Sequence, residues 1–97
     1  MIVKETARFR DWLKGLKDVI GRRRIVARIA RIVSSGHLGD VEPVGDGVSE
    51  LRVHVGPGYR VYFTRRGDEL IVLLCGGDKD SLERDIRLAK AMAAEQK

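Results

Sequence analysis

Four side chains in the middle of the chain have the chemistry needed to handle a phosphate. Arg52 and His54 alternate with apolar residues in one segment, and Arg60 and Tyr62 do so in the next segment. Arginine can bind a phosphate through two N–H groups, histidine can transfer a proton near neutral pH, and tyrosine can stack on a base. Each residue alone is ordinary surface, but the four together predict a binding or catalytic site for RNA.

Two neighbouring strands must position these four residues. Residues 48–55 alternate apolar and polar side chains, and residues 59–65 do the same after a Gly-Pro-Gly turn. We expect the apolar positions to face a layer of helices: Leu51, Val53, Val61 and Phe63. The four polar residues then project together onto the uncovered face of the sheet.

Two helices are expected before this hairpin. An apolar stripe at helical spacing predicts the first helix, with Thr6 as its N-cap, and contains Phe9, Trp12, Leu13 and Leu16. Asp18 is expected to cap the second helix, from about Val19 to Ser34, which Gly36 ends. The buried stripe of the second helix is predicted to contain Ile25, Ile29, Ile32 and Val33.

The other segments complete an α+β pattern. Residues 2–5 and about 40–44 are short strand candidates, and residues 70–75 are apolar at both parities, as in a strand covered on both faces. Asp80 and Glu83 resemble a capping box for a last helix with a buried stripe of Leu82, Ile86, Ala89 and Ala93. The order β-α-α-β-β-β-β-α predicts one domain over residues 1–97, with a mostly antiparallel sheet carrying an N-terminal helical hairpin and a C-terminal helix on one face.

Composition limits the classes of function. The 97 residues are 43% hydrophobic and 34% charged, which excludes wholesale disorder. One cysteine and two histidines exclude an internal disulfide and a zinc cluster, and Glu50 stands alone among the cations of the predicted face, so we expect neither metal nor cofactor. No apolar run resembles a signal peptide or a membrane span, and we expect a cytoplasmic protein.

The positive charge is concentrated in the first part of the chain. The net charge is +5, and residues 1–39 carry ten Lys/Arg against three Asp/Glu. Arg24, Arg28 and Arg31 form a ridge at helical spacing on the second predicted helix. This arginine ridge is either a solvated helix face or a docking surface for RNA backbone or an acidic partner, and the sequence leaves both open.

Several motifs between Phe9 and about Ala91 carry a resemblance to a known family. They are FRDWLKGLKD, RIAR, GHLGD, ELRVH, GPGYRVYF and LLCGGDK. Together they resemble the phage-derived Gp49-like, HigB-type branch of the RelE/ParE toxin superfamily, whose members are often labelled addiction module killer proteins. The Gly-Pro-Gly-Tyr-Arg and Leu-Cys-Gly-Gly-Asp-Lys segments are specific in combination.

The resemblance implies the toxin of a type II toxin-antitoxin system. RelE-like toxins are ribosome-dependent mRNA endonucleases, which inhibit translation without a metal by using the 2′-OH of the RNA as nucleophile. Arg60 then matches the arginine that stabilises the phosphorane, and Arg52, His54 and Lys79 match further basic positions. Residues 81–95 contain neither the tyrosine nor the histidine that relatives use there, so His54 becomes the candidate general acid or base.

The resemblance also implies partners. A cognate antitoxin with a helix-turn-helix DNA-binding domain is expected to cover either the sheet face or the arginine ridge, with operator DNA bound only through the antitoxin. The ribosome and mRNA are the expected targets, and no interaction with a membrane is expected. The alternatives are a ParE-like, non-enzymatic toxin that binds DNA gyrase, and an RNA-binding domain without catalysis; the basic residues favour RNA cleavage.

Overall fold

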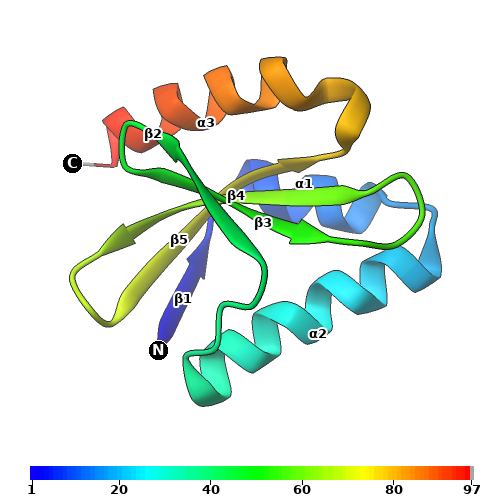
Figure 1. Ribbon diagram of the computed structural model, residues 1–97, viewed down its shortest axis with the longest axis horizontal. Coiled ribbons are helices and arrows are strands. Elements are labelled where there is room, and N and C mark those ends of the chain that lie inside the picture. The colour runs from blue at the N-terminus through cyan, green and yellow to red at the C-terminus, as the bar shows by residue number, and fades with distance from the viewer. Residues whose placement is uncertain (97) are drawn as a thin grey trace.

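The computed structural model describes residues 1–96, which are built around a five-stranded sheet (Figure 1). The strands are β1 (Ile2–Glu5), β2 (Val41–Gly45), β3 (Val48–Val53), β4 (Tyr59–Arg66) and β5 (Leu70–Gly77). Their order across the sheet is β1-β5-β4-β3-β2, and only the β1-β5 pair is parallel. The predicted α+β class with a mostly antiparallel sheet is therefore confirmed.

Three α-helices accompany the sheet: α1 (Ala7–Gly15), α2 (Val19–Ser35) and α3 (Leu82–Glu95). The predicted caps of the first two are confirmed, because Thr6 accepts a hydrogen bond from the Phe9 amide at 3.1 Å and Asp18 accepts one from the Gly21 amide at 3.0 Å. Gly36 ends α2 with a φ of 75°, a conformation that glycine adopts without strain. Among residues 1–96 no helix is long and apolar enough to cross a membrane.

The start of the last helix differs from the prediction. The cap is Asp78, which accepts a hydrogen bond from the Asp80 amide at 2.9 Å and opens a short 3-10 helix, η1 (Lys79–Ser81). The Ser81 hydroxyl accepts one in return from the Asp78 amide at 3.3 Å. The expected Asp80 and Glu83 capping box is wrong because the 3-10 turn moves the capped end two residues towards β5.

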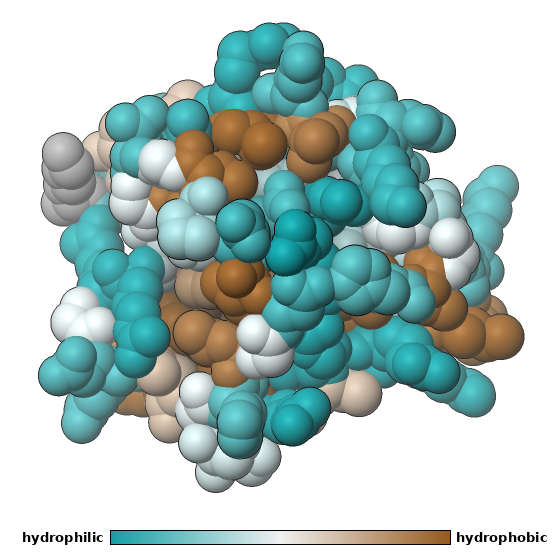
Figure 2. All heavy atoms as spheres, viewed as in Figure 1, coloured by the Kyte–Doolittle hydropathy of each residue, from teal (hydrophilic) through white to brown (hydrophobic). Residues whose placement is uncertain are grey.

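The helices lie on both faces of the sheet, so the expectation that one face carries them all is wrong. Figure 1 shows α2 and α3 on opposite sides of the sheet, and two separate apolar clusters fill the two interfaces. The physical reason is β5, which is apolar at both parities and therefore needs cover on both faces. In the same view hydrophilic atoms cover most of the surface, with apolar atoms between them in separate patches (Figure 2).

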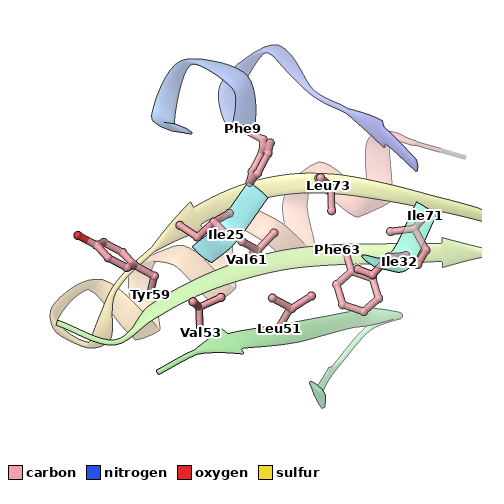
Figure 3. Packing of buried hydrophobic residues seen from close by; sticks show 10 residues of the cluster. All are labelled: Phe9, Ile25, Ile32, Leu51, Val53, Tyr59, Val61, Phe63, Ile71 and Leu73. Atoms are coloured by element: carbon pink, nitrogen blue, oxygen red, sulfur yellow. The ribbon is translucent and has the colours of Figure 1, made fainter. Parts of the chain in front are cut away.

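The larger cluster lies between the sheet and the pair α1 and α2. Figure 3 shows its ten residues: Phe9, Ile25, Ile32, Leu51, Val53, Tyr59, Val61, Phe63, Ile71 and Leu73. The four strand positions expected to face the helices are therefore confirmed. Val33 is an exception to the predicted stripe of α2, because it is 50% exposed and its helix face points away from the sheet.

The second cluster lies between the sheet and α3. It contains Val48, Tyr62, Val72, Leu74, Cys75, Ala89 and Ala93. Burial raises the pKa of the Cys75 thiol to about 11, so it stays protonated at neutral pH, in keeping with the small buried hydrophobe that the sequence predicts. Tyr62 is completely buried here, so the expectation that it projects from an uncovered face is wrong.

Candidate nucleic-acid site

The strand register places Arg52 and Arg60 side by side. Arg52 pairs with Arg60 across β3 and β4, and Arg60 pairs with Gly77 across β4 and β5. Their chain neighbours Leu51, Val53 and Val61 point into the α1-α2 cluster, so both arginines point to the other face of the sheet. Arg52 and Arg60 form a row across β3 and β4, next to the part of that face that packs against α3.

Two contacts hold the guanidinium of Arg60, an ion pair through Nε and a hydrogen bond through one Nη. Its Nε lies 3.4 Å from Oε1 of Glu50, and one Nη donates a hydrogen bond of 3.0 Å to the carbonyl oxygen of Gly58. The side chains of Arg60 and Glu50 are only 14% and 8% exposed. The expectation that Arg60 faces solvent is therefore wrong: it is a partly buried member of an ion pair, fixed in one orientation.

Arg52 belongs to a second group of charges, at the edge of the sheet. Its Nη2 donates to Asp40 at 2.7 Å and to Glu42 at 3.2 Å, while the other Asp40 oxygen contacts Nε2 of His54. The hydrogen bond from Arg52, followed by that from His54, lowers the pKa of Asp40 to about 2. Asp40 is thus a permanent carboxylate at neutral pH, which fixes the two basic side chains relative to each other.

Sequence reasoning missed the acidic half of this site. Glu50 does not stand alone among the cations, because Asp40 and Glu42 lie beside Arg52. The signal for Glu50 was its position two residues before Arg52, on the same face of one strand. Asp40 gave no such signal, since its place depends on the edge strand folding back until its carbonyl accepts from the Arg52 amide at 3.0 Å.

Lys79 reaches the same end of the sheet from η1. Its side chain lies across the turn before β4, where a Cβ added to Gly58 would meet Lys79 Cε at 2.7 Å. Gly58 has a φ of 80°, so the turn requires glycine for its backbone as well as for this close approach. Among residues 1–96, no carboxylate lies within ion-pair distance of the Lys79 amine.

The arginine ridge of α2 is not uniform. Arg28 donates to the carbonyl oxygens of Arg52 at 2.7 Å and Leu38 at 2.8 Å, and burial lowers the pKa of its guanidinium. Arg28 therefore ties α2 to β3. Arg24 and Arg31 are exposed, and they line a pocket of about 340 Å³ together with Ala27, Arg28, Val53 and His54.

Tyr62 takes no part in this surface. Burial raises the pKa of its phenol, and within residues 1–96 its hydroxyl finds no hydrogen-bond partner. A ring with no exposed surface cannot stack on a base, so the predicted RNA contact at Tyr62 is wrong in this structure. Within the same residues no group of three or more His, Cys, Asp and Glu side chains could hold a metal ion.

Known proteins resemble this chain in sequence and in fold. Residues 11–96 match the family described as phage derived protein Gp49-like. An uncharacterized protein of Haemophilus influenzae is 44% identical over 93 residues, which span 96% of this chain and 93% of that protein. A chain in the crystal structure of the intact E. coli RelBE toxin-antitoxin complex superposes with a TM-score of 0.63 at 11% identity, covering 79% of this chain and 94% of that one. At this identity the structural likeness shows the fold alone.

Proposed function

Because this chain belongs to the phage-derived Gp49-like family and shares its fold with a chain of a toxin-antitoxin complex, we propose that it is the toxin of a type II toxin-antitoxin pair. The proposed activity is ribosome-dependent cleavage of mRNA, which inhibits translation in the cytoplasm. The row of fixed cations on the sheet is the structural feature that supports this activity. Membership of the HigB-type branch stays a prediction.

The proposed reaction needs no group beyond the RNA and the side chains. The 2′-oxygen of the RNA attacks the adjacent phosphorus, and the bond from phosphorus to the 5′-oxygen breaks. The 2′-hydroxyl loses its proton to a base and the 5′-oxygen gains one, which leaves a 2′,3′-cyclic phosphate and a 5′-hydroxyl. Arg60 stabilises the charge on the phosphorane, His54 transfers a proton, and Arg52 and Lys79 bind phosphate.

The single observation that carries the proposal is the fixed position of Arg60. Transition-state charge is stabilised best by donors that are oriented before the reaction begins. The hydrogen bond to the carbonyl oxygen of Gly58 and the ion pair with Glu50 orient the Arg60 guanidinium. A guanidinium has five N–H groups, so these contacts leave donors for two phosphate oxygens.

Growth arrest on induction tests the role of Arg60. We expect arrest with the wild type, loss of arrest with Arg60→Ala, and at most partial arrest with Arg60→Lys, because lysine offers a point charge and no fork. Arg65→Ala is the matched control, since Arg65 is an exposed arginine on the same strand. Full toxicity of a folded Arg60→Ala protein would contradict the assignment.

Cleavage in vitro tests the ribosome and metal requirements. We expect the purified protein to cut mRNA on translating ribosomes and to leave naked mRNA largely intact, because a site this small relies on the ribosome to orient the RNA. The purified protein should be treated with chelator, freed of the chelator, and then added to pre-assembled ribosomal complexes that keep their own magnesium. We expect this treatment to leave the cleavage activity unchanged. Efficient cutting of naked RNA that needs added magnesium would overturn the proposed mechanism.

One observation favours a second candidate, a ParE-like toxin that binds DNA gyrase without catalysis. Three of the four basic side chains of the candidate site already contact a carboxylate: Arg52, His54 and Arg60. An RNA phosphate must compete with these carboxylates, whereas a protein partner need not. Inhibition of gyrase supercoiling by the purified protein, unaffected by Arg60→Ala, would favour this alternative over RNA cleavage.

The proposed partner is a cognate antitoxin with a helix-turn-helix DNA-binding domain. A toxin of net charge +5 suits an acidic contact segment, and operator DNA would bind through the antitoxin. Co-expression with the product of the neighbouring gene should give a stable complex and suppress growth arrest. Recovery of this chain alone at full yield, with no growth defect, would count against the toxin-antitoxin assignment.

A further inference from the structure

The outward face of α2 carries apolar side chains that no other part of residues 1–96 covers. Val19, Val26 and Val33 recur every seven residues and are 46%, 48% and 50% exposed. Seven residues are nearly two helical turns, so the three valines form one stripe along the helix. Ile20, which is 63% exposed, and the exposed Ala27 and Ala30 widen the stripe. We call this set of six residues the valine stripe.

The valine stripe is the main apolar exposure of the molecule. Among residues 1–96 five large hydrophobic residues are exposed, and only Ile2 of these five lies outside α2. In the view of Figure 2, apolar atoms reach the surface at the right-hand edge, where Figure 1 places the beginning of α2. Contiguous apolar surface bordered by charged residues is typical of a protein interaction site.

The charge around the valine stripe has one sign. Helix α2 contains five arginines and neither aspartate nor glutamate. Helical geometry places Arg24 and Arg31 along one border of the stripe, Arg22 along the other and Arg23 within it. Among residues 1–96 none of these arginines lies within ion-pair distance of a carboxylate.

Three occupants are conceivable, and the stripe discriminates between them. RNA would neutralise the arginines but leave the valines in water, since its phosphates offer no apolar surface. A second copy of this chain, docked through the same helix, would bring arginines against arginines. An amphipathic helix with an apolar face and acidic borders buries the valines and pairs with the arginines at once.

We propose that the valine stripe of α2 is the docking site for an acidic amphipathic helix of a protein partner. This inference rests on the proposed function, because the partner we assign to it is the antitoxin. Arg22, Arg23, Arg24 and Arg31 select the acidic borders of the partner helix, and the valines bind its apolar face. The docking site lies on the opposite face of the sheet from the row of Arg52 and Arg60.

A synthetic peptide tests the docking site without the antitoxin. The probe is a helix of about 21 residues, with leucine at the a and d positions and glutamate at the e and g positions of each heptad. We expect it to bind the wild-type protein, with a Kd that rises with salt because the arginines contribute. The same peptide with lysine in place of glutamate should not bind measurably.

Matched variants assign the binding to the two parts of the site. Val26→Ser together with Val33→Ser should weaken peptide binding by about tenfold or more, since two apolar contacts are lost. The control for the apolar part is Ile2→Ser, which alters an exposed apolar residue on β1. Arg23→Gln with Arg31→Gln should weaken binding and flatten its salt dependence, whereas Arg65→Gln with Arg66→Gln on β4 should not. Circular dichroism checks that each variant is folded.

Two results would overturn the inference. If the peptide does not bind, and a single-stranded oligouridylate binds in a manner that depends on the α2 arginines alone, the surface is an RNA face. If the wild type sediments as a dimer that Val26→Ser disrupts, the stripe is a contact between two copies of this chain.

Capture of the antitoxin separates failure of this inference from failure of the proposed function. With the neighbouring gene product co-expressed, the Val26→Ser and Val33→Ser protein should lose its partner while its toxicity persists. Undiminished capture by this variant would overturn the docking site and leave the toxin assignment intact. Absence of growth arrest with the wild type would remove the proposed function, whereas the peptide result would stand.

Discussion

Two sets of cations in this molecule are held in opposite ways. On the sheet, Arg52 and Arg60 each contact a carboxylate and sit in a strand register that fixes their backbones. On α2, Arg24 and Arg31 extend into solvent from a helix with no acidic residue. One set is oriented and locally neutralised, and the other is free and adds to a positive field.

The difference assigns different tasks to the two sets. A transition state needs donors in fixed positions, and the carboxylates on the sheet supply that order at the expense of net charge. Attraction of a charged partner needs uncompensated charge, and order adds little to it. The sheet is thus suited to chemistry, and α2 is suited to recognition of a partner.

The largest expected effect is that of Arg60→Ala on RNA cleavage. Loss of one oriented donor commonly lowers a rate by about 10²- to 10³-fold. The same change leaves Glu50 buried without its partner, so we also expect about 2 kcal/mol lower stability, more than a solvent-facing arginine would give. Ribosomal cleavage assays and urea denaturation measure the two effects separately.

A double variant keeps the two effects of Arg60→Ala apart. Adding Glu50→Gln removes the uncompensated charge and should recover about 1 kcal/mol of the lost stability. Activity should stay low, because the guanidinium is still missing. If restored stability brought back cleavage, Arg60 would be a structural residue and the sheet would lose its catalytic role.

Within the arginine ridge, we expect a large contrast between neighbours. Arg28→Ala removes hydrogen bonds to two backbone carbonyls and should lower the free energy of unfolding by about 2 kcal/mol. Arg24→Ala and Arg31→Ala should change it by less than about 0.5 kcal/mol, because both side chains are exposed. Urea denaturation measures the free energy of unfolding of each variant. Equal losses in all three would contradict the distinction between Arg28, which connects α2 to β3, and the free cations Arg24 and Arg31.

The sequence predicted the parts of the fold that depend on local patterns. Caps at Thr6 and Asp18, the Gly36 terminus of α2 and the alternation along β3 and β4 follow from neighbouring residues. The placement of α3 depends on contacts distant in sequence, and only β5, apolar at both parities, indicated that both faces are covered. Tyr62 pairs with Cys75 of β5, so the same cover by α3 buries it.

The same limit applies to the candidate site. Alternation placed Arg52 and Arg60 on one face, but periodicity cannot tell which carboxylate lies opposite a given cation. Asp40 reaches Arg52 and His54 only because β2 pairs with β3 and returns it to the sheet end. The site was therefore predicted as a set of cations and found as a set of ion pairs.

Tyr62 offers a smaller and more specific test of the two faces. Its buried hydroxyl lacks a hydrogen-bond partner within residues 1–96, so Tyr62→Phe should raise the free energy of unfolding by about 1 kcal/mol. Cleavage should be unchanged. A loss of activity in Tyr62→Phe at full stability would mean that the phenol reaches RNA after all.

The smallest expected effect is confined to acid pH and concerns Asp40. Its pKa is lowered from 3.8 to about 2 in the folded chain by the hydrogen bonds from Arg52 and His54, whereas the unfolded chain has the ordinary value. The unfolded state therefore binds a proton more readily, so the stabilisation is complete above about pH 4 and is lost as the pH falls towards 2. Asp40→Asn lacks this titration, and its Tm should fall less steeply than that of the wild type over the same range. Asp68→Asn, in the exposed turn between β4 and β5, is the control and should keep the wild-type slope. Parallel slopes for wild type and Asp40→Asn would mean that Asp40 does not hold the two basic side chains in solution, and the contrast between ordered and free cations would then rest on Arg60 alone.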